Sequence, residues 1–369
     1  MISCGEASGD VYAAALAREI RAQDPSAAIT GFGGDQLRAA GADLTGDFSG
    51  LSVTGLLEVV RLLPRTYAMY RRLVARARAE RPDVFVAVDF PDFNFTLARA
   101  IRKLRIPVVY YISPQLWAWR SGRMKTMRAI ADRVLVIFQF EEPIYRDAGV
   151  PVEWVGHPLL DVTPPSRPRE TVLRELGLPP GAPVVCLLPG SRRNEVRAIL
   201  PDLVQAAKLI RQRMPEVHFV VARAPHVGDD LLLPLEALGD PPAIVVDGRA
   251  DDGLAAADMA LVASGTVTVQ AALHECPMVV VYRLSPLTYR LGRRFVRVET
   301  FAMANLVAGR KVVPELIQDD FVPERVAGEA LKVLTDPVAA ARVRRDLREV
   351  RTRLGEPGAS RRAARAVLE

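Results

Sequence analysis

Short runs of apolar residues recur along the chain, and the longer stretches between them repeat apolar residues every three or four positions. In the first half these runs cover residues 84–89, 108–113 and 134–138, with a shorter one at 152–155. Continuous apolar runs are typical of strands covered on both faces, and the three-to-four spacing is typical of amphipathic helices. Their alternation predicts parallel sheets of the α/β class.

The second half repeats this pattern in five further runs, each followed by a helical spacing: VVCLLPGS, HFVVARA, AIVVDG, MALVASG and MVVVYRL. A proline-rich segment, 162–170, lies between the halves and marks a boundary. We therefore predict one domain over 1–163, a second over 169–335 and a helical tail over 336–369. Two doubly wound, Rossmann-like units are expected to face a cleft where their strand ends meet.

Only residues 1–4 remain for a first strand before the small-residue turn GEASGD. A strand this short is unusual at the start of a parallel sheet. It indicates either a stunted edge strand or a true start upstream.

Charge and cysteine usage narrow the class of partner and compartment. The formal net charge is +6 and the pI is about 9.4. An excess of arginine favours an acidic partner such as nucleotide phosphates, anionic lipid or nucleic acid. The three cysteines have no paired spacing, which favours a reduced, cytosolic compartment. No apolar run approaches the ~18 residues of a membrane span, so we expect a soluble protein or one that lies on a membrane.

A predicted strand at 259–263 passes through Ser264, Gly265 and Thr266 into a helical spacing. Such a junction leaves unpaired backbone N–H groups and the positive end of the helix dipole facing outward, which suits a phosphate. Gln270 lies four residues after Thr266 and projects from the same helix face. The alternative interpretation is an ordinary N-cap between a strand and a helix.

Other junctions of this kind carry glycine or arginine. After GFGGD (31–35), Gln36 occupies the third glycine position of a dinucleotide fingerprint, which disfavours a dinucleotide-dependent dehydrogenase. In LPGSRRNEV (188–196), Arg192 and Arg193 begin a helix whose dipole already favours phosphate. Arg283 follows another strand and offers a third cation, although a surface salt bridge explains it equally well.

Asp89 and Asp92 follow a buried strand in VDFPDFN, where parallel sheets place ligand groups. Capping of the next helix is the structural alternative for both. The loop SPQLWAWRSGR (113–123) carries two tryptophans and two arginines, which indicates a ligand or partner, with packing between domains as the alternative. The four histidines and the acidic residues show no metal-ligand spacing, so a metal-independent reaction is expected.

Residues 51–63 are unusually apolar, and the basic positions Arg65, Arg71, Arg72, Arg76 and Arg78 follow. Apolar followed by basic is a signature of a membrane-surface segment. A core-packed helix followed by a solvated face is the alternative.

Taken together, several ordered motifs resemble the lipid-A-disaccharide synthase family. They are GEASGD (5–10), VDFPDFN (88–94), SPQLWAWR (113–120), GHPLLD (156–161), LPGSR (188–192), ASGTVTVQAAL (263–273), CPMVVVYR (276–283) and NLVAGRKVVPELIQDD (305–320). The resemblance implies a GT-B glycosyltransferase that joins UDP-2,3-diacylglucosamine to 2,3-diacylglucosamine 1-phosphate by an inverting transfer and releases UDP. It also implies lipid A synthesis in a Gram-negative cell, at the cytoplasmic face of the inner membrane, and a homodimer.

The resemblance implies roles for individual residues. Asp92 matches the proposed base, Asp89 would orient or polarise beside it, and Asn305 matches a residue required for activity. The UDP-sugar is expected at Arg192, Ser264, Gly265, Thr266, Gln270 and Arg283, and the acceptor at Glu6, Ser8, Trp117, Arg120 and Arg123. No cofactor and no metal ion are expected. Apolar residues 51–63 would receive acyl chains or dip into the bilayer, and the basic helices would pair with anionic lipid heads.

The chain departs from the family at three places. Members usually have a longer first strand, a proline at the position of Ala304 and a glutamate at that of Gln270. A carboxylate binds ribose hydroxyls more strongly than an amide, so Gln270→Glu is expected to tighten UDP-sugar binding about threefold to tenfold.

Two rival functions follow from the same residues. Another UDP-N-acetylglucosamine transferase or epimerase would share the fold, but it would not need the apolar segment 51–63. A nucleic-acid binder is disfavoured because the arginines are spread over many helices rather than interleaved with aromatic residues in one stripe.

Overall fold

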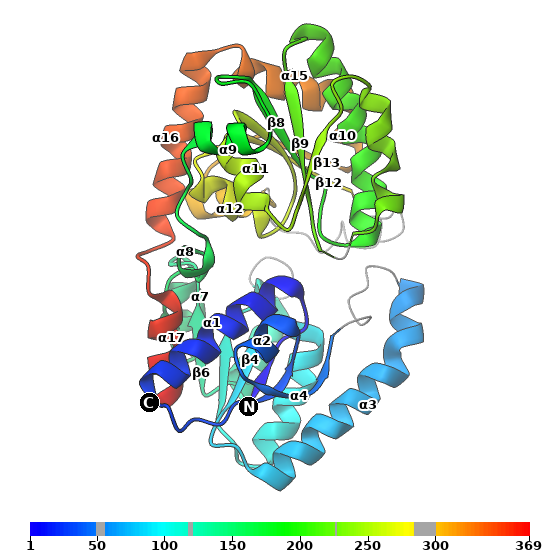
Figure 1. The fold of residues 1–369 in the computed structure, drawn as a ribbon. Helices are drawn as coiled ribbons and strands as arrows, with labels where there is room; N and C mark the ends of the chain where they lie inside the picture. Colours follow the sequence, from blue (N-terminus) through cyan, green and yellow to red (C-terminus); the bar gives the residue numbers. More distant parts are fainter. Residues whose placement is uncertain (49–55, 117–120, 226, 284–299) are drawn as a thin grey trace. The chain divides into compact units, whose positions relative to one another are not determined.

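The computed structural model describes residues 1–48, 56–116, 121–225, 227–283 and 300–369 (Figure 1). It divides into two compact units. The first comprises Met1–Val162 together with Leu354–Glu369, and the second lies between Thr163 and Arg353. The residues of the predicted tail are thus shared between the units: 336–353 belong to the second and 354–369 to the first.

The first unit is built on a seven-stranded parallel sheet with the order β3-β2-β1-β4-β5-β6-β7. Its strands are β1 (Ile2–Ser3), β2 (Thr30–Gly33), β3 (Asp43–Asp47), β4 (Phe85–Val88), β5 (Val108–Tyr111), β6 (Arg133–Val136) and β7 (Val152–Trp154). β1 pairs with β2 on one side and β4 on the other, so its interpretation as a stunted edge strand is wrong.

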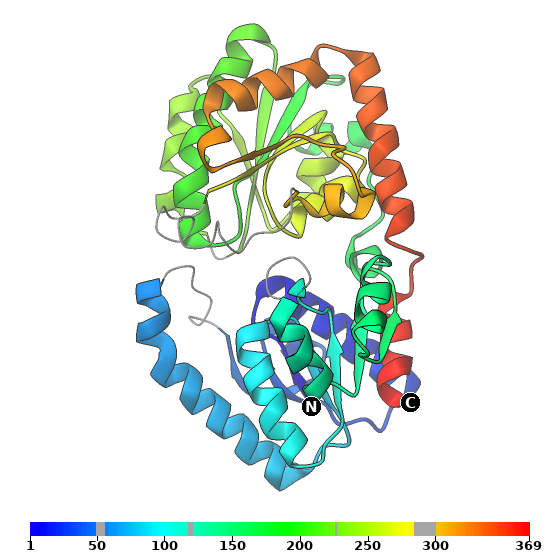
Figure 2. The same cartoon turned by 180° about the vertical axis from the view of Figure 1, so that it is seen from behind.

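Helices cover both faces of this sheet. They are α1 (Ala7–Gln23), α2 (Asp35–Ala39), α3 (Leu56–Glu80), α4 (Pro91–Lys103), α6 (Met124–Ile130), α7 (Glu141–Asp147), α8 (Leu159–Val162) and α17 (Ala359–Leu368). The C-terminal helix α17 packs against α1 (Figure 1). α3, α4 and α6 pack together, and the reversed view brings α4, in cyan, to the front (Figure 2).

The second unit repeats the design with a six-stranded parallel sheet in the order β10-β9-β8-β11-β12-β13. Its strands are β8 (Val184–Leu188), β9 (His218–Arg223), β10 (Ile244–Asp247), β11 (Met259–Ala263), β12 (Met278–Tyr282) and β13 (Glu315–Ile317). Its helices are α9 (Arg169–Glu175), α10 (Arg193–Arg213), α11 (Ala250–Ala256), α12 (Val267–Leu273), α14 (Met303–Ala308), α15 (Pro323–Leu334) and α16 (Pro337–Arg353).

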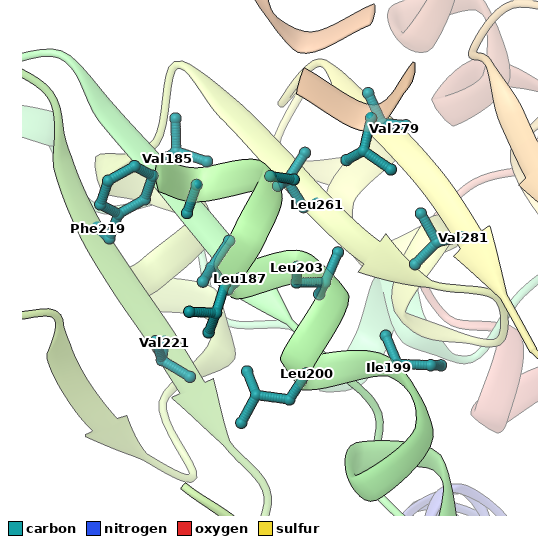
Figure 3. Close-up of a cluster of buried hydrophobic side chains, with 14 of the residues drawn as sticks. Val185, Leu187, Ile199, Leu200, Leu203, Phe219, Val221, Leu261, Val279 and Val281 are labelled. Carbon is teal, nitrogen blue, oxygen red and sulfur yellow. The ribbon is translucent and has the colours of Figure 1, made fainter. Parts of the chain in front are cut away.

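The core of the second unit lies between this sheet and helices α10 and α15. Leu187 of β8, Leu261 of β11 and Val281 of β12 are fully buried against Ile199 and Leu203 of α10 (Figure 3). Along each strand, residues that face α10 alternate with residues on the opposite face of the sheet. The latter, such as Cys186, are also buried. A sheet buried on both faces explains why its strands are continuously apolar in sequence.

The predicted fold class is confirmed, and each of the nine apolar runs forms a parallel strand. β3 and β13 were not anticipated. β3 reads DLTGD and lies at a half-exposed sheet edge, and β13 has three residues, so neither makes an apolar run. Helix α3 runs from Leu56 to Glu80 and continues through Pro64, so the apolar positions from Leu56 onward and the basic positions that follow lie on one helix.

A carboxylate from α8 caps the start of the C-terminal helix, which also packs against α1. Asp161 of α8 accepts hydrogen bonds from the backbone N–H groups of Gly358 and Ser360, at the start of α17. These groups have no partner within the helix, so Asp161 acts as its N-cap from a distant part of the chain. The last residue of the motif GHPLLD, Asp161, therefore stabilises the start of α17.

Candidate functional site

The order of each sheet reverses at one place. In the first sheet this place is between β1 and β4, and in the second it is between β8 and β11. Doubly wound sheets bind ligands outside the carboxyl ends of their strands at such a reversal. The motifs GEASGD and VDFPDFN follow β1 and β4, and LPGSR and ASGTVTVQ follow β8 and β11. Each unit thus brings together two of the motifs found in the sequence.

The turn after β4 has an unusual backbone that is fixed by a buried asparagine. Asp89 and Phe90 both have positive φ, at 46° and 50°, before Pro91 begins α4. Asn94 Nδ2 donates to the carbonyl oxygens of Asp89 (2.8 Å) and Ser3 (3.1 Å), and its Oδ1 accepts from Ser3 Oγ at 2.7 Å. Residues other than glycine adopt a positive φ only where surrounding contacts enforce it.

Two further residues support the same turn. Tyr110 donates its hydroxyl to the Asp89 carbonyl at 2.8 Å, and burial, with Asp89 nearby, raises the pKa of that hydroxyl well above its usual range. Tyr110 therefore stays a donor. Gly5 lies against Phe90, because a Cβ at Gly5 would stand 2.2 Å from the ring. The turns after β1 and β4 are thereby packed on each other.

Asp92 lies in the first turn of α4 and is exposed, with 75% of its side-chain surface accessible. Its carboxylate forms an ion pair with Arg123, with Oδ1 at 2.7 Å from Nη1. The Arg123 guanidinium also lies over the Phe95 ring, 5.6 Å from its centroid. Asp92 and Arg123, predicted separately as base and acceptor-binding residue, are thus in contact. Trp117 and Arg120 lie outside the described residues.

Glu6 and Ser8 begin α1, where Glu6 occupies the N-cap position and both are half-buried. Asp10, which ends the same motif, is buried and accepts hydrogen bonds from the backbone N–H groups of Gly34, Gln36 and Leu37. It therefore caps α2 rather than facing a ligand. The sequence around Asp10 gave no signal that this residue would cap α2, which begins 25 positions later.

The second unit contains the predicted junction in which strand β11 passes through Ser264, Gly265 and Thr266 into helix α12. Gly265 has φ of 155°, and a Cβ there would meet none of the described residues within 4 Å. Its carbonyl oxygen accepts the Thr268 hydroxyl at 2.8 Å, which fixes the turn into α12. Ser264 donates to the Phe301 carbonyl at 3.5 Å. The backbone at Gly265 is thus open to close approach by a ligand.

Arg192 stands at the N-cap of α10, on the other side of the reversal. Its guanidinium pairs with Glu195 at 3.0 Å and keeps 33% of its surface exposed. Arg193 pairs with Asp230 at 2.7 Å. Both cations predicted for phosphate are therefore present at the helix start, each beside a carboxylate.

Gln270 contacts an acidic residue that the sequence did not single out for a ligand. Its Nε2 donates to Asp251 Oδ1 at 2.8 Å, and the same oxygen lies 2.8 Å from His274 Nε2. Asp251 lies in the first turn of α11. His274 is almost fully covered, with 2% of its side chain exposed.

Arg283 departs from its expected place at the donor. Its guanidinium pairs with Asp202 of α10, donates to the Phe321 carbonyl at 2.7 Å and lies over the Phe321 ring. These contacts lock α10 to the segment before α15. The salt-bridge alternative describes Arg283 better than a ligand contact does.

The side-chain amide of Asn305 makes all four of the hydrogen bonds that it can form. Its Nδ2 donates to the Val313 carbonyl (2.9 Å) and to Glu315 Oε1 (2.6 Å), and its Oδ1 accepts from the N–H groups of Val312 (2.7 Å) and Val313 (3.0 Å). An amide has two donors and two lone pairs, so no group remains for a reactant. These contacts hold the chain before β13.

Burial lowers the pKa of His157 to about 3, so its ring is neutral, with Nδ1 accepting from the Leu159 N–H. Among the described residues, no group of three or more His, Cys, Asp or Glu side chains is arranged to hold a metal ion.

The chain matches known proteins over its whole length. The family model described as Lipid-A-disaccharide synthetase matches residues 1–369. The lipid-A-disaccharide synthase of Geobacter sulfurreducens is 42% identical over 372 residues, covering 100% of this chain and 96% of its own. That of Myxococcus xanthus is 43% identical over 371 residues, with the same shares covered.

Solved structures of similar fold are much more distant in sequence. The UDP-GlcNAc 2-epimerase from Neisseria meningitidis, bound to UDP-GlcNAc, has a TM-score of 0.62 at 10% identity and covers 98% of this chain and 97% of its own. The calicheamicin glycosyltransferase CalG4 has a TM-score of 0.59 at 17% identity, covering 100% and 96%. At such identities the likeness shows a shared fold, which is the GT-B arrangement of two parallel-sheet units.

Proposed function

Because the chain belongs to the lipid-A-disaccharide synthase family, we propose that the residues at its two sheet reversals carry out the sugar transfer of that family. The enzyme is a glycosyltransferase that joins UDP-2,3-diacylglucosamine to 2,3-diacylglucosamine 1-phosphate and releases UDP. The observation that carries this function is the match of the family model to residues 1–369, with relatives about 42% identical over the same length. The roles of individual residues rest on the geometry above.

We assign UDP to the second unit. The open backbone at Gly265, with Ser264 and Thr266 beside it, offers N–H groups to a diphosphate. Arg192 stands across the reversal and can supply positive charge as the diphosphate departs. Gln270 lies one turn further along α12 and would accept from the ribose hydroxyls. Arg283 is left out of this set because Asp202 and Phe321 hold it.

We assign the acceptor to the turn after β4 in the first unit. A transfer with inversion needs one base, which takes the proton of the acceptor hydroxyl while its oxygen attacks the anomeric carbon and UDP leaves. Asp92 suits this task because its carboxylate is exposed on a turn that Asn94 and Tyr110 hold rigid. Arg123, paired with Asp92, is a cation suited to the acceptor's phosphate.

Asn305 acts in this scheme as a positioning residue. It fixes Glu315, whose carboxylate accepts from the backbone N–H groups of Phe301 and Ala302. Phe301 in turn accepts the Ser264 hydroxyl. A chain of contacts therefore runs from Asn305 to the donor loop, and it explains how a side chain without capacity for a reactant supports activity.

Product analysis tests the function itself. Incubation of the purified chain with UDP-2,3-diacylglucosamine and 2,3-diacylglucosamine 1-phosphate should yield UDP and an acylated disaccharide 1-phosphate, identified by mass. Activity toward UDP-N-acetylglucosamine without acyl chains, and none toward the acylated pair, would instead support a different sugar-nucleotide enzyme.

Turnover is expected to be insensitive to EDTA, because helix N-termini and Arg192 provide the positive charge that a metal ion supplies in other transferases. The measurement is the initial rate of UDP release before and after EDTA treatment. Loss of more than half the rate, with recovery on adding Mg²⁺, would contradict this expectation.

Helix α3 offers a surface suited to a membrane. Leu63 and Tyr67 are exposed at 55% and 62%, and Arg65, Arg71 and Arg72 are exposed around them. The side chains of Leu56 and Leu57, and all of residues 51–55, lie outside what the structure describes. Within the described residues no helix is long and apolar enough to cross a membrane.

Binding to anionic vesicles should therefore weaken with salt without disappearing, because salt screens the arginines but not the apolar side chains. Vesicle co-sedimentation at 50 mM and 500 mM NaCl provides the test. Leu63→Ser with Tyr67→Ser should abolish the salt-resistant fraction, whereas complete release of the unmodified protein at high salt would remove the apolar contribution.

A further inference from the structure

The amide of Gln270 is oriented by its carboxylate neighbour. A carboxylate only accepts hydrogen bonds, so the atom of Gln270 that faces Asp251 Oδ1 at 2.8 Å is the NH₂ group. Its carbonyl oxygen, Oε1, is then turned away from Asp251. Among the described residues Oε1 has no hydrogen-bond partner, which leaves an acceptor on the helix that follows the phosphate loop.

The carboxylate is itself held in place. His274 lies four residues after Gln270, and its Nε2 donates to the same Asp251 oxygen at 2.8 Å. His274 Nδ1 lies 3.5 Å from Ser166 Oγ, and only 2% of the His274 side chain is exposed. Asp251 is 26% exposed, so its contacts with both side chains are partly shielded from water and charge-assisted.

We propose that Asp251 is a positioning residue for the nucleotide ribose, which acts by taking up the amide NH₂ of Gln270 and presenting Oε1 as the acceptor for the ribose hydroxyls. This inference rests on the proposed contact between Gln270 and the ribose. Ribose is then recognised in this chain by a pair of side chains, a carboxylate on α11 and an amide on α12.

The contact between Gln270 and Asp251 reverses the effect on UDP binding that the sequence alone predicts for Gln270→Glu, which was tighter binding. A glutamate there would place a second negative group within hydrogen-bonding distance of Asp251. Two like charges about 4 Å apart repel strongly even when partly screened, so the side chain would swing away from its place or would have to take up a proton. Gln270→Glu alone should therefore weaken UDP binding, whereas exchange of the two groups should restore it.

The experiment is a titration of the full chain with UDP and with 2′,3′-dideoxy-UDP by calorimetry at pH 8. We expect Gln270→Glu and Asp251→Asn each to weaken UDP about threefold to tenfold, the range of one neutral hydrogen bond, and to leave dideoxy-UDP unchanged. The exchanged variant, Gln270→Glu with Asp251→Asn, should bind UDP within about twofold of the unmodified protein.

A matched control removes the neighbouring acid instead. Asp252 pairs with Arg167 and Arg249, and its hydrogen bonds within the described residues do not include one to Gln270. Gln270→Glu with Asp252→Asn adds one carboxylate and removes one, so it has the same net charge as the exchanged variant. It should stay as weak as Gln270→Glu alone. Rescue by both double variants would mean that only the overall charge matters, and it would overturn the role of Asp251.

The outcomes separate the inference from the function on which it rests. Gln270→Ala should remove the preference for UDP over dideoxy-UDP. If it does so but the exchanged variant gives no rescue, Asp251 does not orient Gln270 and the inference is overturned alone. If Gln270→Ala keeps the preference, the ribose contact is wrong and the inference falls with it. Equal losses for both nucleotides would show a purely structural role, with unfolding temperatures reporting any loss of fold.

Discussion

Replacing Asp92 by asparagine is expected to lower turnover by about 100-fold or more while UDP binds almost as before. Assistance by a general base typically contributes this much, and asparagine keeps the shape and the helix-start position but cannot take up a proton. UDP affinity should hold because we assign UDP to the other unit. The measurements are kcat with both substrates saturating and a separate titration with UDP.

Asp89→Asn is the matched comparison, since it makes the same change three residues earlier on the same turn. It should reduce turnover less, because the structural contacts of Asp89 with Tyr110 and Asn94 involve its backbone carbonyl. Small and equal losses for Asp89→Asn and Asp92→Asn would return both residues to a role in starting α4.

Asn305→Asp is expected to destabilise the second unit by roughly 2–6 kcal/mol. Aspartate has no NH₂ group for the Val313 carbonyl, and it faces the Glu315 carboxylate where the amide stood 2.6 Å away. Loss of a buried donor and gain of a buried like-charge contact each cost on the order of 1–3 kcal/mol. Urea unfolding followed by intrinsic fluorescence measures the change.

The comparison variant is Asp319→Asn, which changes one charge at an exposed position shortly after β13. It should change the free energy of unfolding by less than about 0.5 kcal/mol. A different outcome decides the role of Asn305: unaltered stability of Asn305→Asp together with lost turnover would mean that its amide acts on the reactants and does not position the chain.

The sequence predicted the parts of the fold that depend on local pattern. Strands buried on both faces are continuously apolar, so runs such as 84–89 and 259–263 were recognisable, and the acids after the first of them marked the turn with Asp89 and Asp92. β3 was not predicted because it is a half-exposed edge strand and therefore has no continuous apolar run in its sequence. Pro64 does not end α3, because a proline removes one backbone hydrogen bond and the other turns of the helix persist.

The sequence could not predict which polar residues meet. Asn94 fixes the Asp89 turn through Ser3, which lies 91 positions earlier. Asp251 and Gln270 are 19 positions apart on different helices, so no helical spacing connects them. Arg283 illustrates the reverse case, since a cation after a strand suits a phosphate equally well until Asp202 and Phe321 are seen around it.

The return of the chain to its first unit sets an order of assembly during synthesis. α1 buries a face that includes Ala13, Leu16 and Ala17, and part of its cover is α17, at the far end of the chain. Roughly 200 residues separate Val162 from the end of α17, so a ribosome adding about 5–20 residues per second needs on the order of 10–40 s to deliver it. The second unit emerges whole in that interval, and the half of the protein translated first is the half completed last.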